Sequence, residues 1–447
     1  MATDLERAFM AIEAKQDLIT TLWQYYDGDQ PLVYSTKRLD EVFRNLNARF
    51  NQNWCAVVID SVMDRLNMRG FSIQNEQQDQ AIDAVFNRER IVTDVYDVHE
   101  AALVASEAYV IAWQDEETGE IEVYYNDPRI VHVFYQASKP KEKEFAAKMW
   151  QESTGEWKMT LYYDDRLEYY RTSPMKAGRR PTKATAFRAD DPDQADNPFG
   201  MIPVFHFRLN RRKKKSELDN VITLQDAVNK LLADMMVAAE FGAYKQRYVI
   251  SQSDTSDMKN APGLVWDIPA GDGIGQDTTV GEFNETNLDM YLNSIDKLVN
   301  SIAIITRTPK HYFMSTGANV SGDALIAMES PLVKKVERFQ ELFGSVWIEL
   351  AQFILALSGI QVDSDDINIT WERPESVQPV SEAQGYSTSV AAGIPLVSVL
   401  QRSGWDKTEI DSMLEEKQQE AARAQSSLAQ ALLEAERNFN QGENNGE

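Results

Sequence analysis

The sequence contains very little cysteine. Its 447 residues include a single cysteine, Cys55, which excludes an intrachain disulfide framework and a cysteine-rich zinc site. Cys55 lies in the apolar run 54–59, so we expect its thiol to be buried and to pack as a small hydrophobic group. These features favour a protein of a reducing compartment.

Histidine and phosphate-binding motifs are also scarce. The four histidines are far apart, and no two have the His-x-x-x-His spacing of helical zinc sites. The glycine-rich segment 271–275 lacks the lysine of a nucleotide-binding loop, so we interpret it as a turn. We therefore expect no catalytic residues, no metal and no cofactor, and we expect that the protein is not an enzyme.

The chain has no apolar run of about 18 residues, so no membrane span is expected. Segment 1–15 is charged and amphipathic, without the apolar core of a signal peptide. The net charge of −25, from 45 basic and 70 acidic residues, argues against a protein that grips nucleic acid. It remains compatible with a surface that DNA slides past.

The most informative segment is 216–359. Apolar residues repeat in steps of three and four over 217–242 and 286–308, which predicts two helices of about 39 Å and 34 Å that run antiparallel. Between them lies segment 244–281, which is rich in Gly, Asp and Pro. A longer helix is expected over 322–358, with a kink about one turn before Pro331. This layout is typical of a ring-shaped channel: helices line the bore, a small β module closes one end, and a loop reaches inside.

The rest of the chain predicts an α+β fold, mainly helical, in two to four subdomains. Helices are expected at 1–26, 53–68 (ended by Gly70-Phe71), 81–106 and 382–436, the last broken at 393–395 and at Gly404. Strands are expected at 109–113, 121–125, 130–135, 158–163, 167–170, 201–209 and 367–371. Segment 174–197 is expected to be an exposed loop and 437–447 a disordered tail. Segment 409–436 fits either a coiled-coil arm or a surface helix.

Several short motifs occur in a fixed order along nearly the whole chain. They are Tyr26-Asp27-Gly28, the helix from Asn53 that ends in Gly70-Phe71, Tyr109-Val110, Asp127-Pro128, Ser216-Glu217-Leu218-Asp219, the heptapeptide 224–230 (Leu-Gln-Asp-Ala-Val-Asn-Lys), the hexapeptide 308–313 (Thr-Pro-Lys-His-Tyr-Phe), and Ser321-Gly322-Asp323-Ala324-Leu325 with Glu329. In this order the set resembles the portal proteins of tailed bacteriophages, which connect head to tail.

The resemblance implies a homo-oligomeric ring, usually of twelve subunits, at one vertex of the virion capsid, assembled in the host cytoplasm. Double-stranded DNA would pass through the ring during packaging and ejection. The implied partners are the terminase large subunit, which would supply the energy, the head-completion or adaptor proteins, and the major capsid and scaffolding proteins. No membrane partner is implied.

The resemblance also assigns subdomains by position. It implies a wing of helices and β hairpins at 1–215, stem helices at 216–243 and 286–308, a clip at 244–285, a tunnel loop at 309–321, a second wing segment at 322–378, and a crown at 379–436. The tail follows at 437–447.

The tunnel loop supplies the candidate DNA-facing residues. They are Lys310, His311, Tyr312, Met314, Ser315, Thr316 and Asn319, whose polar and flexible side chains could brush phosphates without tight binding. The alternative is an ordinary connection between two helices.

The only dense basic run consists of Arg211, Arg212, Lys213, Lys214 and Lys215. It could contact phosphate or an acidic patch on a neighbouring subunit, or it could be a solvated strand end. The family pattern does not account for it.

Two acidic groups raise a rival interpretation. Asp190, Asp191 and Asp193 lie in the expected loop, and Asp363, Asp365 and Asp366 precede the last expected strand. A metal-dependent nuclease acting as a monomer would use such carboxylates. A head adaptor or minor capsid protein is a further alternative.

Overall fold

The computed structural model describes residues 2–31, 52–73, 75–114, 118–176, 178–210, 213–242, 247–250, 279–282, 287–313, 322–376, 379–403, 405, 410–420 and 422–423. The chain divides into two compact units, Met1–Pro374 and Glu375–Glu447. Most of the predicted clip, the residues Met314, Ser315, Thr316 and Asn319, and the predicted tail lie outside the described residues.

The N-terminal segment forms two helices, α1 (Asp4–Ala14) and α2 (Gln16–Asp27), instead of the single helix expected over 1–26. Thr3 and Glu6 form a capping box at the start of α1. The break falls at Lys15, whose side chain turns into the protein and is 7% exposed. Gly28 ends α2 with a left-handed φ of 77°, the usual geometry of a helix C-terminus.

The next helix is shorter than predicted. It is α4 (Trp54–Met63), and the chain then turns into strand β1 (Met68–Ile73). The expectation that the helix reached Met68 and ended in Gly70-Phe71 was wrong, because those residues pair with β12 (Ile367–Trp371) in an antiparallel ladder. Helices α5 (Glu76–Arg88) and α6 (Ile91–Ala105) follow.

Two antiparallel sheets follow α6. In the first, β2 (Glu107–Gln114) lies between β3 (Ile121–Asn126) and β9 (Val204–Arg208), which confirms the predicted hairpin and the strand near 201–209. The second contains strands in sequence order. They are β4 (Val131–Tyr135), β5 (Lys143–Gln151), β6 (Trp157–Tyr162), β7 (Arg166–Arg171) and β8 (Arg188–Asp196).

Strand β8 corrects the prediction of an exposed loop over 174–197. A short 3-10 turn, η1 (Ala184–Ala186), precedes it, and β8 pairs with β7 along the edge of the sheet. Asp190, Asp191 and Asp193 therefore lie on a strand and not in a loop. Asp190 contacts Arg171 at 3.0 Å and Lys158 at 3.7 Å, which offsets the charge that disfavours pairing here.

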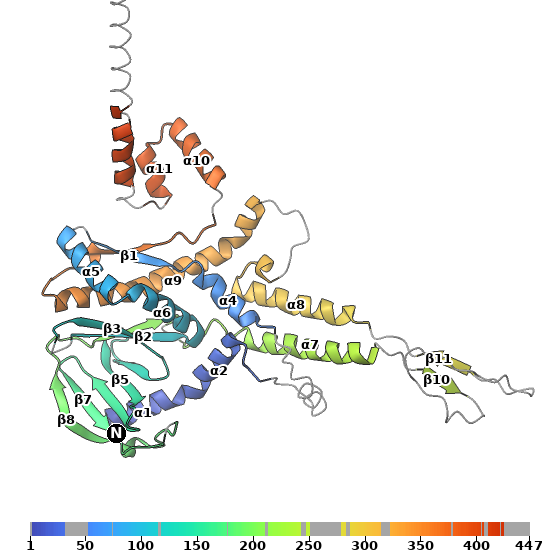
Figure 1. Ribbon diagram of the computed structural model, residues 1–447, viewed down its shortest axis with the longest axis horizontal. Helices are drawn as coiled ribbons and strands as arrows, with labels where there is room; N and C mark the ends of the chain where they lie inside the picture. Colours follow the sequence, from blue (N-terminus) through green and yellow to red (C-terminus); the bar gives the residue numbers. More distant parts are fainter. Residues whose placement is uncertain are drawn as a thin grey trace, which may run out of the picture. The chain divides into compact units, whose positions relative to one another are not determined.

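The largest apolar core surrounds helix α9 (Gly322–Leu357), which lies over the β2–β3–β9 sheet (Figure 1). Its fully buried aromatic residues are Phe343, Trp347 and Phe353. Pro331 lies inside the helix, where its missing N–H leaves the carbonyl four residues earlier without the usual donor. The kink expected there stays a prediction.

Helices α7 (Ile222–Gly242) and α8 (Asp289–Thr306) run side by side (Figure 1). A short antiparallel ladder, β10 (Arg247–Ile250) with β11 (Thr279–Glu282), occurs between them in the sequence. The expectation of paired helices separated by a small β element is confirmed for these residues.

The second unit contains α10 (Pro379–Ala391), α11 (Leu396–Arg402) and a helical stretch over 410–420. The break predicted at 393–395 is confirmed, since Gly393 has a φ of 92° and Pro395 precedes α11. Within the described residues of the whole chain, helices and antiparallel strands are both abundant, as an α+β fold requires, and no helix there is long and apolar enough to cross a membrane.

Candidate channel-lining segment

The segment that could face a channel is the helix pair α7–α8, the connection after α8, and the start of α9. The two helices face each other with apolar side chains. Val228 on α7 and Ile295, Val299 and Ile302 on α8 are each at most 6% exposed. The sequence predicted an apolar stripe of this period on the second helix. Ile295 and Ile302 belong to that stripe and are buried, whereas Ile305, which was also part of it, is 50% exposed.

Polar side chains of the heptapeptide 224–230 attach α7 to the chain that enters α4. Gln225 is fully buried; its Oε1 accepts from the Trp54 N–H at 2.8 Å, and its Nε2 donates to the Gln52 carbonyl. Asn229 accepts from the Gln52 N–H at 3.2 Å. The heptapeptide therefore fixes α7 against the start of α4, which an apolar stripe alone would not specify.

The entry into α7 is also fixed by buried polar groups. Ser216 donates through its hydroxyl to the Val104 carbonyl at 2.6 Å and accepts from the Leu218 N–H at 3.0 Å. These bonds hold 217–221 as turns, so α7 begins at Ile222 and not at the predicted residue 217.

Helix α8 ends where the sequence predicted a stop, near Thr308-Pro309. Its last residue is Thr306, and Arg307 has a left-handed φ of 59°. Lys335 of α9, which is 8% exposed, donates to the Thr306 carbonyl at 2.9 Å and pairs with Glu217 at 2.7 Å. A cation thus lies at the negative end of α8, where it is electrostatically favourable.

The connection then forms a 3-10 turn, η2 (Lys310–Tyr312), which a second polar cluster holds. Arg65, just beyond α4, donates to the Tyr312 hydroxyl at 2.6 Å and contacts Glu329 of α9 at 3.0 Å. The Tyr312 hydroxyl donates to Glu329 at 3.3 Å, and His311 Nε2 lies 3.4 Å from the same carboxylate. Burial, as the largest cause, raises the pKa of Tyr312, so its hydroxyl keeps its proton and can donate.

The described DNA-facing candidates are therefore three residues with different environments. Lys310 is exposed, whereas His311 and Tyr312 are partly buried and contact Glu329 within the subunit. The sequence missed Arg65, Lys335 and the anchoring role of Glu329, because their partners are remote in the chain. Glu329 was noted only as part of a motif.

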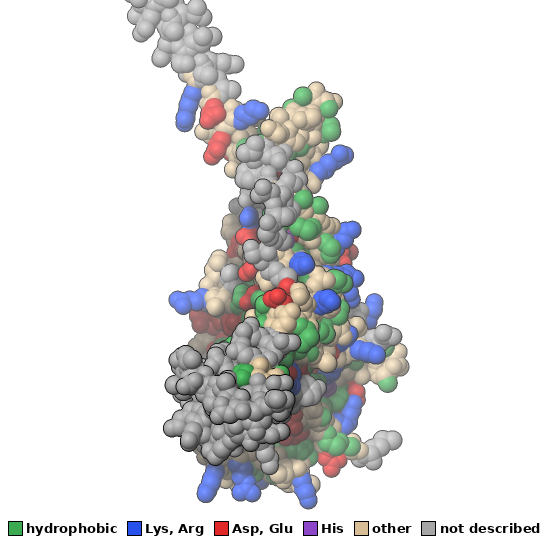
Figure 2. All heavy atoms as spheres, turned by 90° about the vertical axis from the view of Figure 1, so that its right-hand side faces the viewer, with side chains coloured by type: hydrophobic (Ala, Val, Ile, Leu, Met, Phe, Trp, Pro, Cys, Tyr) green, Lys and Arg blue, Asp and Glu red, His purple; other side chains and the backbone are tan. Residues whose placement is uncertain are grey.

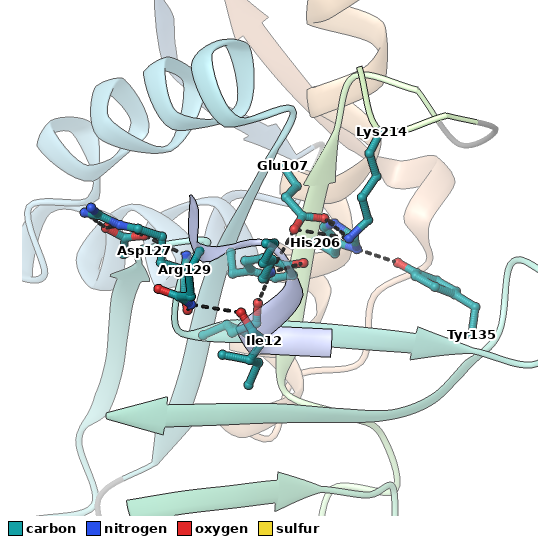
Figure 3. A network of polar contacts seen from close by, with 11 residues as sticks. Ile12, Glu107, Asp127, Arg129, Tyr135, His206 and Lys214 are labelled. Carbon is teal, nitrogen blue, oxygen red and sulfur yellow. Dashed lines mark hydrogen bonds and ion pairs between the residues drawn. The ribbon is translucent and has the colours of Figure 1, made fainter. Parts of the chain in front are cut away.

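The basic run lies elsewhere, beside a buried ion cluster that sequence reasoning also missed. Arg211 and Arg212 are outside the described residues, while Lys213, Lys214 and Lys215 are exposed. Lys214 Nζ lies 3.0 Å from a carboxylate oxygen of Glu107, and Figure 3 shows the two side chains meeting near His206. Lys215 donates to Asn220 at 3.0 Å. Lys214 and Lys215 thus have partners within the subunit.

Glu107 is the centre of that cluster and is 2% exposed. Lys15, at the break between α1 and α2, contacts it at 2.8 Å. Burial would raise the pKa of Glu107, but the charge of Lys15 and the nearby His206 hold it well below its usual value. Burial lowers the pKa of Lys15 to about 8 and that of His206 to about 4. The cluster joins the α1–α2 break to the two sheets and to the chain entering α7.

The other groups weighed in the sequence have ordinary surroundings. Cys55 is fully buried, and burial raises the pKa of its thiol to about 12, as expected for a packing residue. Asp363, Asp365 and Asp366 lie at the short turn η3 (Ser364–Asp366) before β12. Within the described residues, no three His, Cys, Asp or Glu side chains converge as metal ligands.

Lys and Arg side chains do not gather into one surface on the side of the molecule drawn in Figure 2. Among the described residues visible there, blue side chains lie mostly near the edges and alternate with apolar and acidic ones. A single phosphate-gripping face is therefore not seen in this view, in keeping with the acidic net charge of −25.

The chain was compared with solved structures, with curated proteins and with protein-family models. Chains from two solved structures, the virion of a native gene transfer agent particle and the neck of an empty one, have TM-scores of 0.46 and 0.45 and are 11% and 12% identical to this chain. These alignments cover 84% and 81% of this chain and 96% and 92% of the others.

Two curated relatives are named portal protein. The one from Mycobacterium phage L5 is 25% identical over 194 residues, which span 40% of this chain and 39% of the relative. The one from Mycobacterium phage D29 is 26% identical over 150 residues, or 32% and 31% of the two chains. Each match thus spans well under half the length of the relative.

The family model described as phage portal protein, SPP1 Gp6-like, extends much further. It matches residues 11–423, which include most of each unit, the helix pair and the connection after α8. The chain therefore belongs to the SPP1 Gp6-like family of phage portal proteins.

Proposed function

We propose that the protein forms the ring at the portal vertex of a phage-like capsid, through which double-stranded DNA passes during packaging and ejection. The observation that carries the proposal is the family match over 11–423, since it includes the channel-lining segment together with the elements that anchor it. One subunit encloses nothing, so the channel requires a heterologous interface that closes into a ring, for which we propose twelve subunits in the virion.

In this proposal the stem consists of 216–243 and 286–308, the clip of 244–285, and the tunnel loop of 309–321. The wing consists of 1–215 and 322–378, the crown of 379–436, and the tail of 437–447. The clip would dock the terminase large subunit during packaging and head-completion proteins afterwards, while the wing and crown would face the major capsid and scaffolding proteins. Assembly would occur in the host cytoplasm, and no enzymatic activity is required of this chain.

Exposed apolar side chains on α8 support an interface between subunits. Met290 is 60% exposed and Ile304 is 69% exposed. They are separated by fourteen residues, close to four helical turns, and therefore share the face opposite the one that α8 buries against α7. A neighbouring subunit would remove this apolar surface from water.

Two polar segments would meet DNA or a neighbour. The exposed Lys310 lies near the start of the proposed tunnel loop, and a single exposed ammonium suits transient contact with phosphate. The exposed part of the basic run, chiefly Lys213, would contact phosphate or an acidic patch on the next subunit. Lys214 and Lys215 would contribute less, because they already contact Glu107 and Asn220.

A site-specific cross-link tests the DNA path. Cys55 is fully buried, so a cysteine placed at an exposed position can be labelled selectively with a photoactivatable reagent. We expect Lys310→Cys, in DNA-filled particles that contain the variant, to cross-link to DNA on illumination. The matched control is Lys139→Cys, whose lysine is 63% exposed on the β4–β5 turn, and which should not cross-link. Equal labelling of DNA from both positions, or none from Lys310→Cys, would contradict the proposed path.

A further inference from the structure

The chain leaves its first unit beside the polar cluster that holds η2. Pro374 is the last residue of that unit, and its carbonyl accepts from Arg65 at 2.6 Å. The Arg65 side chain is 12% exposed and contacts Glu329 and Tyr312 with its other terminal nitrogen. One guanidinium therefore bonds both to the connection after α8 and to the point where the chain passes into the second unit.

The geometry of arginine makes these bonds interdependent. A guanidinium is planar, and its N–H groups point in fixed directions, so it cannot follow one partner without changing its angle to the others. In this cluster Nη1 donates to Pro374, while Nη2 donates to Tyr312 and to Glu329. A displacement of η2 that carries Tyr312 with it would rotate or release the plane that holds the Pro374 carbonyl.

Low exposure makes the loss of a partner costly. Glu329 is 10% exposed and Arg65 12%, so water cannot readily replace a lost bond to either charge. Close to Arg65 in the sequence, the Asn67 carbonyl accepts from the Glu372 N–H at 2.9 Å, which ties the residues just before Pro374 to the chain just after Arg65.

We propose that Arg65 mechanically couples η2 to the chain exit at Pro374, so that a change in one alters the order of the other. A contact made by the connection after α8 would then change the backbone order at the start of the second unit, Glu375–Glu447. This effect would not require any change in the helix pair. The coupling depends only on contacts within the first unit, so it can hold whether or not the DNA path proposed above is right.

The test is hydrogen exchange of the full-length protein and its Tyr312→Phe variant, read separately in peptides covering 308–313 and 372–380. Tyr312 and Pro374 both bond to the Arg65 guanidinium, so the variant changes the bond partner of Pro374 and leaves Pro374 itself unaltered. The variant removes only a hydroxyl, which accepts from Arg65 and donates to Glu329. We expect exchange to rise about threefold or more in both peptides, because two hydrogen bonds to charged groups are lost. A rise confined to 308–313 would overturn the proposal.

Two further variants make the result specific. Arg65→Lys keeps the charge but cannot hold three partners in a fixed plane, and should raise exchange in both peptides at least as much as Tyr312→Phe. The control is Arg69→Met, which removes a neighbouring arginine that contacts Glu372 at 3.5 Å and is 56% exposed. Exchange at 308–313 should be unchanged in Arg69→Met. An equal rise there would show a general loosening and would also overturn the coupling.

Discussion

At the scale of single residues, buried polar side chains determine how the helices attach. Gln225, Ser216 and Lys335 are each nearly inaccessible, and each bonds to backbone groups of a segment remote in the sequence. Such bonds add little net energy when made but are costly to break, because a buried N–H or C=O then has no partner. They specify the position of α7 and α8 more than they stabilise the protein.

Gln225→Met tests this point, because methionine has a similar volume but cannot bond to the Trp54 N–H or the Gln52 carbonyl. We expect a loss of about 1–3 kcal/mol in the free energy of unfolding, measured with urea. Thr223→Ala, an exposed change on the same helix, should cost under about 0.5 kcal/mol. Equal effects of the two would show that the Gln225 bonds are not needed.

Buried histidines predict acid sensitivity. His99 is fully buried, accepts a hydrogen bond from Trp347 Nε1 at 3.0 Å, and has its pKa lowered by burial from 6.5 to about 3. Because the folded pKa is below the unfolded one, the unfolded chain binds a proton as pH falls through 6.5, while the folded protein does not until about pH 3. The free energy of unfolding therefore decreases as pH falls through this window. His206, whose pKa is about 4, acts in the same direction.

The contribution of His99 can be isolated with His99→Gln. Each such histidine adds a slope of up to about 1.4 kcal/mol per pH unit. Urea unfolding at several pH values between 6.5 and 4 should show a shallower decline for the variant, even though its stability at pH 7 is lower. An identical slope in the two proteins would mean that His99 titrates normally in the folded state.

At the scale of elements, the spacing of apolar residues was sufficient to predict a helix or strand wherever that element buries one regular face. It predicted α8, α9, the β2–β3 hairpin and β12 to within a few residues. It failed at β8, because that acidic edge strand has no apolar alternation and exists through its pairing with β7. It did not predict β5 at all, although β5 lies inside its sheet between β4 and β6.

Starts and breaks of helices were the other source of error. Residues 217–221 have helical periodicity, but the bonds of Ser216 to α6 hold them as turns. The break at Lys15 follows from an ion pair with Glu107, 92 residues away, which no local pattern reveals. The candidate site was predicted only in part for the same reason. The sequence indicated the connection after α8, but its anchors Arg65 and Lys335 could be identified only from the structure, because their partners are remote in the sequence.

The exposed apolar face of helix α8 predicts that this helix forms part of the interface between subunits. Ile304→Asp places a charge on its exposed apolar face, and we expect it to prevent or weaken ring formation while the subunit stays folded, because burying an unpaired carboxylate at an interface is costly. Sedimentation gives the assembly state and circular dichroism the fold. Met10→Asp, the same kind of change at a side chain 56% exposed on α1, is the control and should still assemble. Normal assembly of Ile304→Asp would place the interface elsewhere.

At the scale of the whole molecule, the composition and the fold agree with a structural role. The net charge is −25, and the described residues of the candidate channel segment contain no dense basic patch. Both features suit a wall that DNA passes without binding tightly. The nuclease alternative requires carboxylates that converge on a metal. Asp190 on β8 instead forms ion pairs with Arg171 and Lys158, and the aspartates at η3 lie on a turn. The family assignment favours the ring over this alternative.

The ring is the central claim, and the mass and shape of the purified full-length protein test it most directly. Light scattering combined with negative-stain imaging should give a closed ring with a central hole and a mass many times that of the 50.8 kDa subunit, about twelvefold for the assembly proposed in the virion. A monomer that persists at high protein concentration would contradict the account, because one subunit cannot enclose a channel.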